Sequence, residues 1–155
     1  MGDSDVRREL GPLSLALDRA WTGHAANLVL RLAAGVVLAY HGWLKLQEVS
    51  GFAGYVEFLG IPAPDLMAYV VTYLEFLGGI ALIAGLVTRY VAALFVIEMI
   101  FTISLVKFDV GLIASEGGVG AELDILILAI ALGLVLTGAG RWSLDALFAG
   151  RSRVG

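Results

Sequence analysis

The sequence contains no cysteine, and its only histidines are His24 and His41. The absence of cysteine excludes disulfides, thiol redox chemistry, thiolate-ligated iron–sulfur clusters and cysteine-linked haem. The two histidines lie on one stretch of chain and cannot ligate a single haem from its opposite faces. We therefore expect no metal site and no intrinsic cofactor, so any redox role depends on another centre.

Charge is also scarce in this chain. Charged residues make up 15% of the 155 residues, hydrophobic residues make up 59%, and the formal net charge is -4. A soluble domain needs more charge to cover its surface, so this composition predicts a protein that resides in the lipid bilayer. No run of lysine or arginine is present, and nucleic-acid binding therefore has no support.

Long apolar stretches occupy most of the chain. They cover residues 26–46, 66–86, 90–106 and 123–137, and each is bounded by charge, proline or glycine. A transmembrane helix needs about 20 apolar residues, so the last two stretches are near the lower limit. Because a segment in lipid must satisfy its own backbone hydrogen bonds, these stretches favour helices. The sequence predicts an all-α fold, a bundle of four transmembrane helices.

The positions of the arginines predict how this bundle is oriented. Seven arginines precede the first span, lie between spans two and three, or follow span four: Arg7, Arg8, Arg19, Arg89, Arg141, Arg151 and Arg153. The positive-inside rule then places both termini in the cytoplasm. The N-terminal sequence lacks the apolar core of a signal peptide. We expect a multi-pass protein of the plasma (inner) membrane.

The predicted organisation has three parts. Residues 1–25 form a cytoplasmic or interfacial segment, with a short separate helix over 13–21 at the membrane surface. Residues 26–138 form the membrane domain, and residues 139–155 form a cytoplasmic tail.

Ionisable residues interrupt the apolar stretches. A charge at mid-membrane costs about 2.5–3.5 kcal/mol on insertion scales, so such residues need partners or protons and are functional candidates by default. Glu75 and Glu98 fall near the middle of their spans. The candidate polar cluster, for a ligand or a proton, consists of Arg31, His41, Lys45, Glu75, Glu98, Glu122 and Asp124.

Helical spacing predicts which of these residues share a face. On the first span, Arg31 and Lys45 lie on one face with small residues between them. Glycines on such a face let a neighbouring helix approach closely. We expect helix-packing roles for Gly35, Gly42, Gly78, Gly79 and Gly133.

An inward-facing basic stripe on the first span predicts ion pairs with acids of the other spans. The expected pairs are Arg31 with Glu75, and Lys45 or His41 with Glu122 or Asp124. Glu98 has no basic partner in this scheme and is expected to be neutral or to face another subunit. The alternative is that these pairs only fix the register and packing of the helices.

Several pieces of the sequence resemble the DoxX family of small membrane proteins. They are Arg31 with HGWLKL (41–46), FLGIPAP (58–64), EFLGGIALIAGLVTR (75–89), AELDILIL (121–128) and GAGRWSLDALF (138–148). The resemblance implies four membrane helices, with polar family positions at Arg31, Lys45, Glu75 and Glu122. It also implies a redox setting, because relatives include the small subunit of a thiosulfate:quinone oxidoreductase and others are associated with membrane complexes that handle oxidative or thiol stress.

Two hypotheses of function follow, with a third less favoured. The first is an accessory subunit of a redox-linked complex, whose polar interior binds a quinone while a partner protein supplies electrons; the chain would then not be catalytic alone. The second is a non-enzymatic membrane scaffold or assembly factor. The third is a small transporter or proton path, which four short spans without proline-broken helices support poorly. Assembly into a homo-oligomer stays open.

Overall fold

The computed structural model describes residues 3–107, 111–113 and 120–151, with the side chains of residues 21–107, 111–113 and 120–150. Helices connected by short turns make up this part of the chain, and it contains no β-strand. The all-α prediction is therefore confirmed for the described residues.

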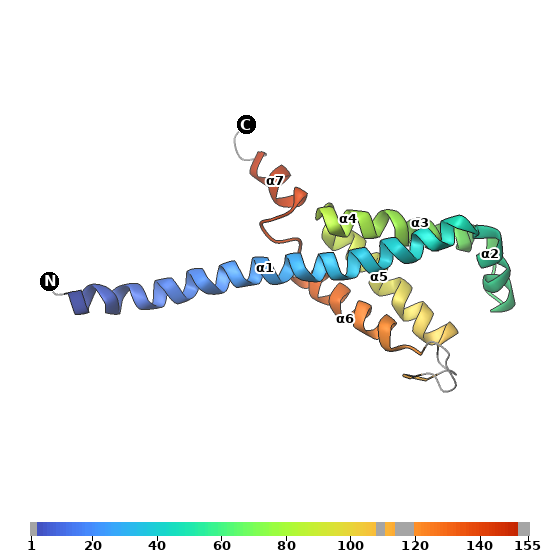
Figure 1. Ribbon diagram of the computed structural model, residues 1–155, viewed down its shortest axis with the longest axis horizontal. Helices are drawn as coiled ribbons and strands as arrows, with labels where there is room; N and C mark the ends of the chain where they lie inside the picture. The colour runs from blue at the N-terminus through green and yellow to red at the C-terminus, as the bar shows by residue number, and fades with distance from the viewer. Residues whose placement is uncertain (1–2, 108–110, 114–119, 152–155) are drawn as a thin grey trace.

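The first helix, α1, is one continuous element from Asp3 to Gln47. At 1.5 Å per residue its 45 residues extend about 67 Å, more than twice the hydrocarbon thickness of a bilayer. Figure 1 shows its N-terminal part projecting well beyond the other helices. The prediction of a separate short helix over 13–21 is wrong, because no break divides that segment from the first span.

The second span consists of three consecutive elements. Helix α3 (Pro64–Tyr73) continues through a π-helical turn, η1 (Leu74–Gly78), into α4 (Gly79–Ala84). Pro64 suits the start of α3 because the first helical residues need no backbone donor. Gly85, at φ 68°, ends α4 in a left-handed conformation that glycine adopts without strain. Before this span, the short helix α2 (Val49–Phe58) turns across the end of α1 (Figure 1).

The remaining helices form the other side of the bundle. Helix α5 (Thr88–Phe101) ends in a second π-helical turn, η2 (Thr102–Val106), and packs extensively against α6 (Glu122–Thr137). The terminal helix α7 (Leu144–Arg151) follows a short connection and points away from the bundle in Figure 1. We call the end of the bundle that carries α2, Lys107 and the start of α6 the α2 end. The opposite end, which carries Arg31, the 85–87 turn and the 138–145 segment, is the α7 end.

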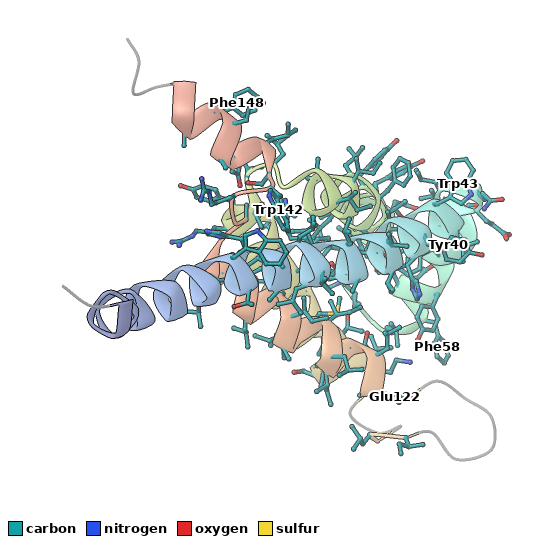
Figure 2. All side chains as sticks on the ribbon, turned by 60° about the vertical axis from the view of Figure 1, so that its left-hand side comes forward. Tyr40, Trp43, Phe58, Glu122, Trp142 and Phe148 are labelled. Atoms are coloured by element: carbon teal, nitrogen blue, oxygen red, sulfur yellow. The ribbon has the colours of Figure 1, made fainter. Side chains whose placement is uncertain are left out.

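Within the described residues, three helical segments are long and apolar enough to cross a membrane: Trp21–Gln47, Pro64–Ala84 and Thr88–Val106. They coincide with the first three predicted spans. Helix α6 occupies the position of the fourth, but its 16 residues extend only about 24 Å, against about 30 Å for the hydrocarbon layer. Aromatic side chains mark both ends of the bundle (Figure 2), with Tyr40, Trp43 and Phe58 at the α2 end and Trp142 and Phe148 at the α7 end.

Glycines bring α1 against the second span. A Cβ atom on Gly42 would overlap the backbone of Phe76 in η1, and one on Gly79 would overlap the backbone of Ala39. A Cβ on Gly35 would lie 2.8 Å from the carbonyl oxygen of Gly79. The helices therefore touch backbone to backbone, which only glycine permits.

The other two glycines expected to pack differ from each other. A Cβ on Gly78 would lie 2.9 Å from the ring of Phe95 on α5, so this glycine makes room for an aromatic side chain. No described atom lies within 4 Å of the Cβ position of Gly133. The expected packing role of Gly133 is therefore not met by any described helix.

Replacing Gly42 by alanine should destabilise the bundle, because the added methyl group overlaps the backbone of Phe76. Overpacking of this kind costs about 1–3 kcal/mol. Thermal unfolding in detergent should give a clearly lower Tm for Gly42→Ala. Gly133→Ala is the matched control on α6 and should leave the Tm unchanged. Equal Tm values for the two variants would contradict the close contact between α1 and η1.

Candidate functional site

Glu75 lies inside the π-helical turn η1, near the middle of the second span. A π-turn inserts one residue into the helical repeat and so rotates the side chains that follow; such turns occur frequently at functional sites. The Glu75 side chain is buried, with 5% of the residue exposed. An isolated carboxylate at this depth would be strongly destabilising, so its partners determine its state.

Lys45 is the principal partner of Glu75. Its Nζ atom donates to Oε2 of Glu75 at 2.5 Å, from the last turn of α1, where the helix dipole also favours a cation. The same Nζ lies 4.8 Å from the ring centroid of Phe52 on α2. The Lys45 side chain stays 23% exposed, against 7% for that of Glu75. Lys45 is therefore the part of the pair that opens toward the surface.

Glu98 on α5 brings a second carboxyl group to this pair. It is 8% exposed, it interacts electrostatically with Glu75 and Lys45, and its Oε2 atom has no hydrogen-bond partner. Lys45, Glu75 and Glu98 together form what we call the buried triad.

The start of α6, at the α2 end of the bundle, carries two further acids, Glu122 and Asp124. Asp124 is half-buried there and interacts electrostatically with Lys45, His41 and Lys107, and also with Glu98. His41 is exposed on α1. Glu122 is exposed at the beginning of α6 (Figure 2), and so it lies outside the triad. Of the seven candidate residues, three form the triad and Asp124 lies close to it.

Arg31 lies at the opposite end of the bundle. It is fully buried, and its Nη2 donates to the carbonyl oxygen of Trp142 at 2.5 Å. Its guanidinium fills the space beside Gly85 and interacts electrostatically with Asp145. The predicted pair of Arg31 with Glu75 is therefore wrong. Lys45 takes that place, because the triad forms nearer to its end of α1.

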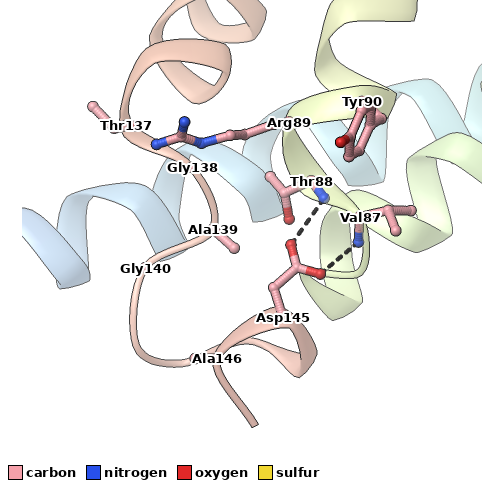
Figure 3. A pocket seen from close by; sticks show the side chains of 10 residues that line it. All are labelled: Val87, Thr88, Arg89, Tyr90, Thr137, Gly138, Ala139, Gly140, Asp145 and Ala146. Atoms are coloured by element: carbon pink, nitrogen blue, oxygen red, sulfur yellow. Dashed lines mark hydrogen bonds between the residues drawn. The ribbon is translucent and has the colours of Figure 1, made fainter. Parts of the chain in front are cut away.

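Asp145, in the first turn of α7, binds the turn between α4 and α5. Its carboxylate accepts from the backbone N–H of Val87 at 2.6 Å and of Thr88 at 2.9 Å (Figure 3), while its own N–H donates to the carbonyl of Gly85 at 2.9 Å. An acid at this position is stabilised by the positive N-terminus of α5. A shallow pocket of about 400 Å³ lies beside this contact, between the turn and the 138–146 segment.

Sequence reasoning missed Trp142 and Asp145 as partners of distant residues. Asp145 lies in the first turn of α7, where an acid is common because it stabilises the start of its own helix. The sequence therefore gives no sign that it contacts another helix. Asn27 is similar: it is buried, and its side-chain amide donates to the carbonyl of Gly138 at 3.2 Å. Trp142 and Asp145 lie in the 138–148 piece that resembles the DoxX family, and Asn27 contacts it. That resemblance was the one feature of the sequence that pointed to these residues.

The triad has the chemical properties of a small polar binding site in an apolar surrounding. It contains an ammonium donor, two carboxyl groups and, on Glu98, an acceptor oxygen without a partner. The described residues contain no group of three or more His, Cys, Asp or Glu placed to hold a metal ion. The arrangement can hydrogen-bond a carbonyl or hydroxyl group and can take up or release a proton.

Comparison with known proteins gives a consistent result. The sequence model of the DoxX family matches residues 26–108, more than half of the chain. The chain is 36% identical to the protein named "Putative oxidoreductase CatD" of Bacillus subtilis, over 77% of this chain and 84% of that protein. It is 31% identical to "Inner membrane protein YqjF" of Escherichia coli, over 77% of this chain and 89% of that protein.

A further relative is "Uncharacterized membrane protein Rv3486" of Mycobacterium tuberculosis, which is 31% identical over 79% of this chain and 81% of that protein. No solved structure matches the chain significantly. The family match includes Arg31 and the whole buried triad, and the relatives are covered over most of their length. The chain therefore belongs to the DoxX family of membrane proteins.

Proposed function

We propose that this protein is a membrane subunit of a redox-linked complex and that its buried triad binds the polar head of a quinone. The observation that carries the proposal is the triad itself. An ammonium and two carboxyl groups lie together in an apolar bundle, and one carboxyl oxygen, Oε2 of Glu98, has no partner. Buried polar groups are normally satisfied, so an orphaned acceptor at this depth suggests a missing donor.

The residues of the triad fit both states of such a ligand. A bound quinone supplies two-electron, two-proton redox chemistry, with electrons from a partner protein that carries a flavin or metal centre. Lys45 Nζ, or a carboxyl group of Glu75 or Glu98 when it carries a proton, can donate to a carbonyl oxygen. Oε2 of Glu98 can accept from a hydroxyl group. The carboxyl pair can therefore pass a proton to the ligand and regain one afterwards.

The surroundings of the triad favour a lipid-soluble ligand. Lys45 is partly exposed beside the ring of Phe52, and the ring of Trp43 lies 6.0 Å from that of Phe76. Aromatic rings that flank a polar group are suited to a flat ring held partly in the membrane. One relative carries the word oxidoreductase in its name, which supports a redox setting.

The proposal includes the placement of the chain in the membrane. We propose four crossings, with α6 as the short fourth, both termini in the cytoplasm, and the plasma membrane as the location. Support comes from the apolar composition of α6, its packing along α5, the arginine distribution, and a relative named as an inner membrane protein. A short span is accommodated by local thinning of the bilayer.

A scaffold role is the second candidate, and one observation favours it. The N-terminal part of α1 projects beyond the bundle as a continuous helix (Figure 1), where a partner protein could bind. In that case the Lys45–Glu75 pair would serve only to fix the register of α1 against η1. The two functions differ in what a change at the triad should do.

Glu75→Gln should weaken quinone binding while preserving the size of the side chain. Loss of a hydrogen bond to a charged group costs about 1.5–3 kcal/mol, which is about tenfold or more in affinity. Mass spectrometry of lipids retained after gentle extraction should find quinone with the native protein and much less with the variant. Glu57→Gln, which changes an exposed acid on α2, should retain the native amount. Native protein that retains no quinone would contradict the proposal.

A paired substitution should separate stability from ligand binding. Lys45→Met alone leaves Glu75 buried without its cation, and removing one partner of a buried pair costs about 3–5 kcal/mol. The double variant Lys45→Met with Glu75→Leu should regain most of the thermal stability in detergent. It should still retain little quinone, because the ammonium of Lys45 and the carboxyl group of Glu75 are gone and only Glu98 remains of the triad. A stable double variant that keeps native quinone content would favour the scaffold role.

The absence of cysteine makes the topology directly testable. Gly54 in α2 and Gly150 in α7 are exposed and would lie on opposite sides of a four-crossing bundle. Each can be replaced by a single cysteine. A membrane-impermeant maleimide applied to intact cells should label Gly54→Cys and should label Gly150→Cys only after the membrane is opened. Labelling of both from the same side would show that α6 does not cross.

A further inference from the structure

The pocket at the α7 end is separate from the buried triad, and the proposed quinone chemistry does not use it. It lies between the start of α5 and the segment that connects α6 to α7 (Figure 3). Its volume of about 400 Å³ is within the range of small-molecule sites, about 300–1,000 Å³. Among the described residues that line it, Arg89 is the one cation.

Arg89 lays its guanidinium across the C-terminal end of α6. Its Nη2 donates to the carbonyl oxygen of Leu136 at 3.2 Å, and a Cβ atom on Gly138 would lie 3.0 Å from its Nε. Figure 3 shows the side chain extending toward Thr137 and Gly138. A guanidinium has five N–H donors in a planar fork, so this one hydrogen bond to a described residue leaves donors for a ligand. Phosphate is the group that this fork binds best, through two parallel hydrogen bonds.

Asp145 lines the same pocket, but its carboxylate is already bound. Its two oxygens accept from the backbone N–H groups of Val87 and Thr88, at 2.6 Å and 2.9 Å. The charged side chains that the structure describes at this end are three arginines and one acid: Arg31, Arg89, Arg141 and Asp145. The α7 end is therefore basic in sum, and an anion is favoured beside Arg89.

The pocket also lies where lipid headgroups are expected. Arg89 is the second residue of Thr88–Val106, a segment long and apolar enough to cross a membrane. Next to it, Tyr90 is 78% exposed and Leu136 is 76% exposed, so an apolar rim adjoins the guanidinium. Tyrosine is typical of the membrane–water interface. A free phosphate ion would leave this rim uncovered, whereas a phospholipid would bring acyl chains to it.

We propose that this pocket binds the phosphate of an anionic phospholipid, with Arg89 as its main donor and with Tyr90 and Leu136 against its acyl chains. Basic pockets between membrane helices bind anionic headgroups at the cytoplasmic surface, and the α7 end is on that side in the proposed topology. A headgroup in the pocket contacts both the start of α5 and the 138–140 connection, and it therefore stabilises this end of the bundle. Quinone binding at the triad is neither required nor tested.

The test measures lipid binding to the full chain, purified in a neutral detergent and freed of native lipid. Native mass spectrometry compares phosphatidylglycerol with phosphatidylcholine of the same acyl chains. We expect phosphatidylglycerol to bind about tenfold more tightly, and to raise the Tm because it binds the folded state. Equal affinities for the two lipids would overturn the proposal. Inorganic phosphate at matched ionic strength should leave the Tm unchanged; a rise equal to that with phosphatidylglycerol would identify a free anion as the occupant and overturn the lipid assignment.

Variants at two arginines test the site. Arg89→Gln should lower the affinity for phosphatidylglycerol to that for phosphatidylcholine, whereas its Tm without lipid should fall only slightly, because the lost contact with Leu136 is exposed. Arg89→Lys keeps the cation and should recover part of the preference. Arg141→Gln is the matched control: it removes the same charge from an exposed position outside the pocket and should keep the native preference. Equal losses in Arg89→Gln and Arg141→Gln would indicate general attraction to a basic surface and would overturn the site.

Discussion

The burial of a carboxylate at mid-membrane is the constraint on which this structure depends. Glu75 at 5% exposure needs a cation close by, and Lys45 supplies it at 2.5 Å. The short distance requires that α1 lie directly against η1, which in turn requires glycine at positions 42 and 79. The ion pair and the glycine contact are thus parts of one arrangement. Without the glycine contact the charge of Glu75 would be unpaired, and without the ion pair the close approach of the helices would bury an isolated charge.

The two basic residues of α1 serve the two ends of the bundle differently. Lys45 keeps a flexible ammonium beside two carboxyl groups and stays partly exposed, which suits a site that exchanges a ligand or a proton. Arg31 is fully buried and held by a backbone carbonyl beside Gly85, where its rigid guanidinium fixes the 138–145 segment. Asp145 reinforces the same end by binding the first amides of α5. One end of the protein is therefore closed by directional hydrogen bonds and the other carries the mobile charges.

Between these ends, the apolar cluster insulates one polar region from the other. Phe95 and Leu82 are almost completely buried, and they separate the Arg31 contact from the triad along the bundle. In this low-dielectric interior an unpaired charge is expensive, so the buried Glu98 depends on its interactions with Glu75 and Lys45. Glu75 lies within the π-turn η1 and pairs there with Lys45 of α1.

The sequence by itself determined the helical class, the first three spans and the depth of Glu75 and Glu98. These properties follow from apolar length and from a fixed rise per residue, both of which are local. It also indicated the close-packing glycines on α1 and on the second span. Which base meets which acid was decided only by the tertiary structure, because axial depth does not fix helix rotation or neighbour identity. The spacing alone matched Arg31 to Glu75, whereas packing placed Lys45 there and gave Arg31 to Trp142, a residue with no ionisable group to reveal the contact.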